Sequence, residues 1–147
     1  MRGFLGIDPG WGLTIVRVAM AAIFIAAGHT KFFVWGVDKV TDNMAKYGFP
    51  YPVVFAWTAT VLELGGGVAL LLGLFGRWLG LLYAIQFAIA FFFVKLRTVG
   101  FSGGWTDLML LATGLLLFLA GPGRVAVDSL WLEKTSAPRY VKRTRTA

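Results

Sequence analysis

The sequence alternates between long apolar stretches and short breaks that are polar or rich in glycine. Four stretches approach the length that a membrane-spanning helix requires, which is about 20 residues. They cover residues 12–35, 52–75, 78–96 and 105–121. This pattern predicts an all-α fold, an integral membrane bundle of four transmembrane helices, within a domain of residues 1–128. Residues 129–147 are predicted to form a basic C-terminal tail, and the even number of spans places both termini on one side of the membrane.

The breaks predict how the spans connect. Residues 36–51 form the longest loop, whose polar part is expected to make a short interfacial helix. Only residues 73–77 separate the second span from the third, so these two helices are expected to pack as an antiparallel hairpin. Residues 95–104, with the flexible sequence Ser-Gly-Gly at their end, form the third connection. Gly-Pro-Gly at 121–123 ends the last span, because proline removes a hydrogen-bond donor and glycine favours a break.

The composition limits the chemistry of the chain. Hydrophobic residues make up 58% of the 147 and charged residues only 14%, which is too apolar for an ordinary soluble domain. The absence of cysteine excludes iron–sulfur clusters and a covalently attached haem. The formal net charge of +7 includes the basic tail, where such residues set orientation and contact anionic lipid. No pattern of a nucleic-acid-binding protein accompanies it, so no nucleic acid is expected as a partner.

Lys and Arg residues also predict the orientation. Cytoplasmic loops carry an excess of both, and the face with the termini holds the larger share, so the termini are predicted to be cytoplasmic. That face has Arg2, Arg77, Arg124, Lys134, Arg139, Lys142, Arg143 and Arg145, and the opposite face has Lys31, Lys39, Lys46, Lys95 and Arg97. A secretory signal peptide is the competing interpretation of the first apolar stretch, but Arg17 inside that stretch argues against cleavage.

Five ionisable residues lie within or at the ends of the spans and are the candidate site residues: Arg17, His29, Lys31, Glu63 and Asp107. Charges at this depth are costly, so they normally face the bundle interior and find partners. One interpretation is a buried Arg17–Glu63 ion pair that only fixes helix register. The other is that Glu63 exchanges protons or binds a quinone head group, with Arg17, His29 or Lys31 as its partner.

The remaining polar residues add little chemistry. A single histidine excludes bis-histidine ligation of a haem by this chain alone. Gln86, in the centre of the third span, is expected to bond to a neighbouring helix, with a weaker case for lining a ligand site. The sequence has no nucleophile–base pair and no residues at metal-ligand spacing, so no catalytic or metal-binding residues are predicted.

Several short motifs occur in order along the four spans. Arg17 is followed by Gly-His-Thr-Lys-Phe at 28–32, the second span holds Glu-Leu-Gly-Gly-Gly at 63–67 and Leu-Gly-Leu at 72–74, and Gly-Pro-Gly-Arg at 121–124 precedes Asp128. Together these motifs resemble the DoxX-like family of small four-helix bacterial membrane proteins. Asp107 departs from the pattern, because such proteins usually have a glutamate there. The resemblance covers residues 13–128 and implies a multi-pass protein of the bacterial inner membrane.

The resemblance also implies a role in membrane redox chemistry. The leading hypothesis is a membrane subunit that anchors a redox partner and offers a quinone-binding pocket built around the five candidate residues. Such a subunit is at most part of a quinone-linked oxidoreductase, with other subunits and membrane lipid as its partners. The alternative is a structural accessory subunit of a larger respiratory or photosynthetic complex. A small transporter is a third class, disfavoured because no inverted repeat is evident.

Overall fold

The computed structural model describes residues 8–128 and consists of helices over that range, with no strand among the described residues. The predicted basic tail, residues 129–147, lies outside them. Four helical stretches are long and apolar enough to cross a membrane: Pro9–Trp35, Pro52–Leu72, Gly76–Thr98 and Gly100–Ala120. The prediction of an all-α bundle with four transmembrane helices is therefore confirmed. A short helix is also present in the first loop, where one was expected, as α2 (Val37–Lys46).

Three of the spans contain a π-helical segment, in which the backbone hydrogen bonds join residues five apart in sequence instead of four. The first span is α1 (Pro9–His29) followed by η1 (Thr30–Trp35), and the second is α3 (Pro52–Val61), η2 (Leu62–Gly66) and α4 (Gly67–Leu72). The third is α5 (Gly76–Ile89), η3 (Ala90–Lys95) and α6 (Leu96–Thr98), and the fourth is α7 (Gly100–Ala120). Segments of this kind occur often at functional sites in helices.

The third connection is shorter than predicted. The helix α7 begins at Gly100, so the sequence Ser-Gly-Gly at 102–104 is helical and the expectation of a flexible loop there is wrong. The physical reason is packing. A Cβ atom added to Gly104 would lie 2.8 Å from the ring of Phe91, so glycine is used here for close helix contact rather than for a turn.

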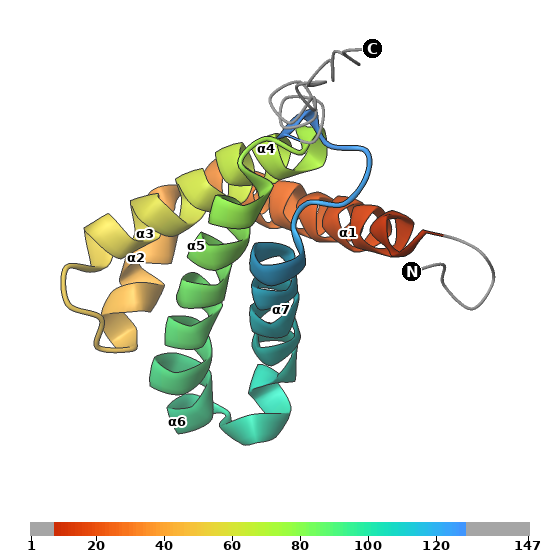
Figure 1. Ribbon diagram of the computed structural model, residues 1–147. Helices are drawn as coiled ribbons and strands as arrows, with labels where there is room; N and C mark the ends of the chain where they lie inside the picture. Colours follow the sequence, from red (N-terminus) through yellow and green to blue (C-terminus); the bar gives the residue numbers. More distant parts are fainter. Residues whose placement is uncertain (1–7, 129–147) are drawn as a thin grey trace, which may run out of the picture.

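The four spans associate as two pairs. In one pair α5 lies along α7, and in the other α1 lies against η2 and α4 (Figure 1). The chain does reverse tightly at Gly73, where φ is +74°, but the expected hairpin of the second and third spans is wrong, since these two have few contacts with each other. Glycines determine which helices pack together, because they allow two backbones to come close. A Cβ atom added at Gly80 would lie 2.7 Å from Gly114 O, and one added at Gly28 would lie 2.5 Å from Leu64 N.

The two pairs meet in an aromatic core. Tyr83 and Phe87 of α5 stack against Phe24 of α1, with ring centroids 3.9 and 5.5 Å apart. The Tyr83 hydroxyl donates a hydrogen bond of 2.8 Å to Leu62 O in the second span. Tyr83 is completely buried, so this contact holds the first three spans together.

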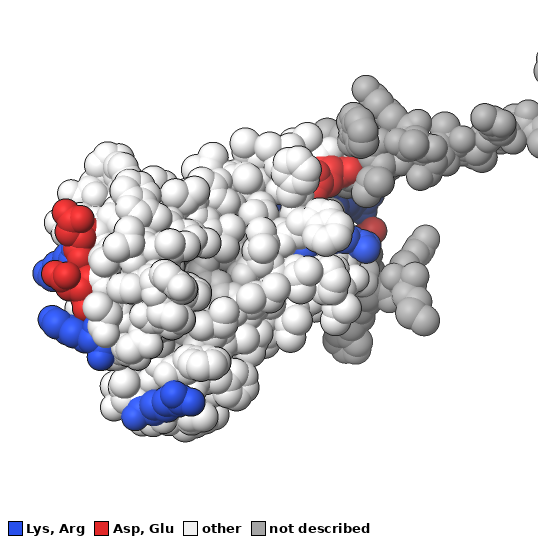
Figure 2. Space-filling model, turned by 90° about the vertical axis from the view of Figure 1, so that its left-hand side faces the viewer, with Lys and Arg blue, Asp and Glu red and all other residues white. Residues whose placement is uncertain are grey.

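The outer surface of the bundle is apolar between its two ends, as contact with lipid requires. Figure 2 shows one side of the molecule with charged residues at its two ends and a broad uncharged band between them. Large apolar side chains are exposed on every span, including Ile15, Val61, Ile85 and Leu119. In water such a surface would aggregate, whereas in a bilayer it contacts acyl chains.

Candidate functional site

A charged cluster lies inside the bundle and joins the first three spans. Lys31 Nζ lies 2.5 and 2.6 Å from the two carboxylate oxygens of Glu63, and Gln86 Nε2 donates a hydrogen bond of 3.0 Å to Glu63 Oε1. Glu63 is 3% exposed, so its charge is withdrawn from solvent and lipid alike. A carboxylate buried to this degree requires the ion pair and the hydrogen bond that it receives.

The local sequence explains why these residues meet. Gly28 allows α1 to approach the backbone at Leu64, and Lys31 follows Gly28 by one helical turn while Glu63 is adjacent to Leu64. Lys31 and Glu63 each lie in a π-helical segment, η1 and η2 respectively. The close contact between the backbones of α1 and the second span therefore brings the Lys31 ammonium group next to the Glu63 carboxylate.

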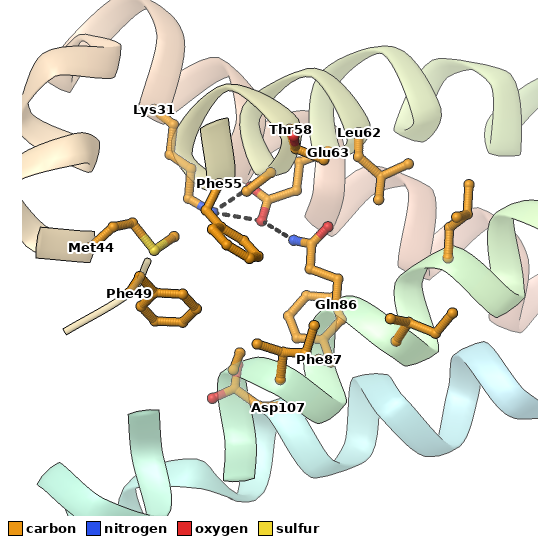
Figure 3. Close-up of a pocket in the computed structure, with 15 residues that line it drawn as sticks. Lys31, Met44, Phe49, Phe55, Thr58, Leu62, Glu63, Gln86, Phe87 and Asp107 are labelled. Carbon is orange, nitrogen blue, oxygen red and sulfur yellow. Dashed lines mark hydrogen bonds and ion pairs between the residues drawn. The ribbon is translucent and has the colours of Figure 1, made fainter. Parts of the chain in front are cut away.

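A cavity of about 290 Å³ adjoins the cluster. Figure 3 shows Lys31, Glu63 and Gln86 in a row along one side of it and Asp107 of α7 on the opposite side. Most of its lining is apolar: Met44, Phe49, Phe55, Ala59, Leu62, Leu82, Ile85, Phe87, Ile89 and Ala90, with Thr58 as the remaining polar residue. An apolar cavity with a few convergent polar groups is the usual form of a small-molecule site.

The structure brings together three of the five predicted site residues. Lys31, Glu63 and Asp107 all line the cavity. His29 does not: it is exposed, and its ring lies 4.9 Å from the ring of Phe33. Arg17 does not either, since it lies 14 residues before Lys31, which corresponds to about 21 Å along a helix.

Arg17 instead holds the segment after α7, residues 121–128, which we call the closing segment. Its guanidinium donates hydrogen bonds of 2.8 Å to Pro122 O and 2.5 Å to Val125 O. At the same place the Asp128 carboxylate accepts a hydrogen bond of 2.8 Å from Gly76 N. The predicted Arg17–Glu63 ion pair is therefore wrong, because each residue has other partners at different positions along the bundle.

Other cavity residues gave weaker signals or none. Gln86 was recognisable as the polar group in the centre of its span, and its bond to a neighbouring helix is confirmed. Met44 and Phe49 come from the first loop region, and Phe55 is one of many apolar residues in the second span. Nothing in their sequence distinguishes them from residues that face lipid.

The polar groups define what the cavity can bind. Lys31 and Gln86 carry N–H donors, and Glu63 and Asp107 carry carboxyl groups that can accept or release protons. The Gln86 Oε1 atom is buried and has no hydrogen-bond partner among the described residues. Such an atom is a vacant acceptor beside the cavity, and a ligand hydroxyl is a natural donor to it.

Fold and site together define a small integral membrane protein with four spans and an ionisable cavity between them. The model of the DoxX family matches residues 12–96, which include Lys31, Glu63 and Gln86. The chain belongs to the DoxX family. No solved structure matches it.

Curated relatives agree with this assignment. The chain is 30% identical to "Inner membrane protein YphA" of Escherichia coli (strain K12), over 79% of this chain and 87% of the relative. It is 33% identical to "Inner membrane protein YqjF" of the same organism, over 84% of this chain and 94% of the relative. It is also 31% identical to "Putative oxidoreductase CatD" of Bacillus subtilis (strain 168), over 80% of this chain and 84% of the relative.

Proposed function

We propose that this chain is the membrane subunit of a quinone-linked oxidoreductase, in which it anchors a redox partner and binds a quinone ring in the cavity beside Glu63. One observation carries the proposal: a mainly apolar cavity with N–H donors from Lys31 and Gln86 on one side and the Asp107 carboxyl on the other. The relative named as an oxidoreductase supports the reaction class. The names of the Escherichia coli relatives support a bacterial inner membrane location. The larger share of Lys and Arg on the face with the termini supports a cytoplasmic position for both ends.

The residues present fit a quinone. Lys31 Nζ and Gln86 Nε2 are neighbouring N–H donors for one of its carbonyl oxygens, and its ring needs an apolar slot, which Phe55 and Phe87 help to form. A bound quinone supplies acceptance of two electrons and two protons, the electrons coming from the redox partner. Protons taken up from water would be relayed to the cavity through the carboxyl groups of Asp107 and Glu63, each of which accepts a proton before it passes one on.

Direct binding tests the proposal. The protein, purified in mild detergent, is titrated with decyl-ubiquinone, and binding is measured by native mass spectrometry. Glu63→Gln, which removes the charge that holds Lys31, is expected to weaken binding about tenfold, or about 1.4 kcal/mol. Arg77→Gln is the control, because it removes a charge at a span end outside the cavity lining. Absence of binding by the unaltered protein, or equal binding by both variants, would overturn the proposal.

The partner requires a second experiment. The protein is extracted from its native membrane in mild detergent, and the proteins that remain with it are identified. A retained soluble oxidoreductase is the expected result. A large established respiratory complex without quinone at this chain would instead identify a structural accessory subunit.

A further inference from the structure

One wall of the cavity differs from the others in exposure. Leu82 and Ile85 of α5 line the cavity and are 47% and 50% exposed, and Thr58 of α3 is also exposed. On the other sides Glu63 is 3% exposed and Phe87 is 8% exposed. The protein wall around the cavity is therefore thinnest between α3 and α5.

The packing of the spans explains this thin wall. Helix α5 packs mainly on α7, and α3 packs mainly on α2, so α3 and α5 have few contacts with each other. Small residues direct α5 toward α7, where Gly80 and Gly114 allow the backbones to touch. Neither helix therefore closes the space between the second span and the third.

The thin wall lies at membrane depth. Thr58 follows the start of its span, Pro52, by six residues, and Ile85 follows Gly76 by nine. These separations correspond to about 9 and 14 Å along a helix. The hydrocarbon core is about 30 Å thick, so the exposed side chains at this wall contact acyl chains and not water.

The side of the cavity toward α2 is covered. Met44 and Phe49 line it there, and the ring of Phe49 lies 5.3 Å from the ring of Phe55. Figure 3 shows Met44, Phe49 and Phe55 grouped on one side of the cavity. A ligand that comes from water on this side meets three bulky apolar side chains, whereas one that comes from lipid meets the exposed edges of two helices.

We infer that the cavity opens sideways into the bilayer between α3 and α5, and that its ligand is a long-tailed, membrane-dissolved quinone. The polar ring lies against Lys31 and Gln86, and the tail leaves past Thr58, Leu82 and Ile85 into lipid. This inference rests on the proposed function and adds the class of quinone and its route of access. A water-soluble quinone without a tail binds only through its ring.

A bulky residue at the opening tests the inference, with a matched control on another span. Ile85→Trp narrows the opening, and Ile23→Trp introduces the same change on α1, where Ile23 is 51% exposed and does not line the cavity. The probes are decyl-ubiquinone and the same ring without a tail, 2,3-dimethoxy-5-methyl-1,4-benzoquinone. Binding is measured by native mass spectrometry on detergent-purified protein, and far-UV circular dichroism confirms that each variant is folded. Leu82→Trp replaces Ile85→Trp if the latter fails to fold.

We expect Ile85→Trp to weaken binding of the tailed quinone about tenfold and to change binding of the ring alone by less than about twofold. Ile23→Trp should change neither. Equal effects of Ile85→Trp on both probes, or no effect on either, would overturn the sideways opening while the proposed function stands. If the unaltered protein binds neither probe, the proposed function fails and the inference fails with it.

Discussion

Replacing Gly28 by alanine adds one methyl group at the point where α1 contacts the second span. That carbon would lie 2.5 Å from Leu64 N and 2.8 Å from Leu64 Cα, where ordinary contacts between heavy atoms are about 3.5–4.0 Å. Both atoms belong to the backbone of a helix, so no rotamer change relieves the overlap. The two helices must separate by about 1 Å.

Two opposing effects set the size of the destabilisation. Overpacking a tight contact costs about 1–3 kcal/mol, and contact with backbone favours the upper value. Alanine gains about 1 kcal/mol over glycine in a helix interior. The expected net loss in the free energy of unfolding is therefore about 2 kcal/mol. Because Lys31 is one turn beyond Gly28, the same separation moves its ammonium group away from Glu63 and is expected to weaken the quinone binding that we propose.

Gly12→Ala is the matched control on the same helix. Among the described residues, no heavy atom outside the local helix lies within 4 Å of a Cβ added at Gly12, so this change carries the helix-propensity gain without the overlap. Unfolding of both variants in mixed detergent micelles, followed by far-UV circular dichroism, gives the two free energies. The reasoning is refuted if Gly28→Ala is as stable as Gly12→Ala, because the helices would then not be in backbone contact.

Three further changes test other contacts. Lys31→Met leaves the buried Glu63 carboxylate without its cation and should lower the free energy of unfolding by about 3–5 kcal/mol. The double variant Lys31→Met with Glu63→Leu should recover most of this loss. Equal stability of the single and double variants would contradict a buried ion pair. Arg17→Lys keeps the charge but cannot span both carbonyls of the closing segment, so unfolding should show a loss of about 1.5–3 kcal/mol, and an unchanged stability would exclude this role. Tyr83→Phe keeps the ring stacking and removes the hydroxyl bond to the second span; a loss of about 1 kcal/mol is expected in the same unfolding assay, and no loss would mean that the bond adds nothing.

The spans could be predicted from sequence because hydrophobicity and length suffice to identify them. Their pairing could not. A short turn between two spans shows that the chain reverses direction there. Which spans then pack against each other depends on where their backbones can come into contact. Gly80 and Gly28 decide that choice through contacts with Gly114 and Leu64, which lie far away in sequence.

The charged residues that line the cavity could be named from the sequence, but their pairings and the apolar lining could not. The cost of charge in a membrane identifies Lys31, Glu63 and Asp107 as residues that need partners. Which cation meets Glu63 depends on the height at which the first span contacts the second, and sequence alone does not give that height. The partners of Arg17 are backbone carbonyls, which no pattern of side chains in the sequence reveals.

The bonds of Arg17 also bear on the order of events during synthesis. Its two acceptors follow it by 105 and 108 residues, so at about 5–20 residues per second the arginine waits about 5–20 s before either carbonyl exists. Throughout that interval three more spans must leave the ribosome, and the Arg17 guanidinium inside the first apolar helix lacks both of these carbonyl partners. The insertion machinery, water or lipid phosphate must accommodate the charge until then. Arrival of the closing segment therefore marks the moment at which the nascent chain can complete its fold.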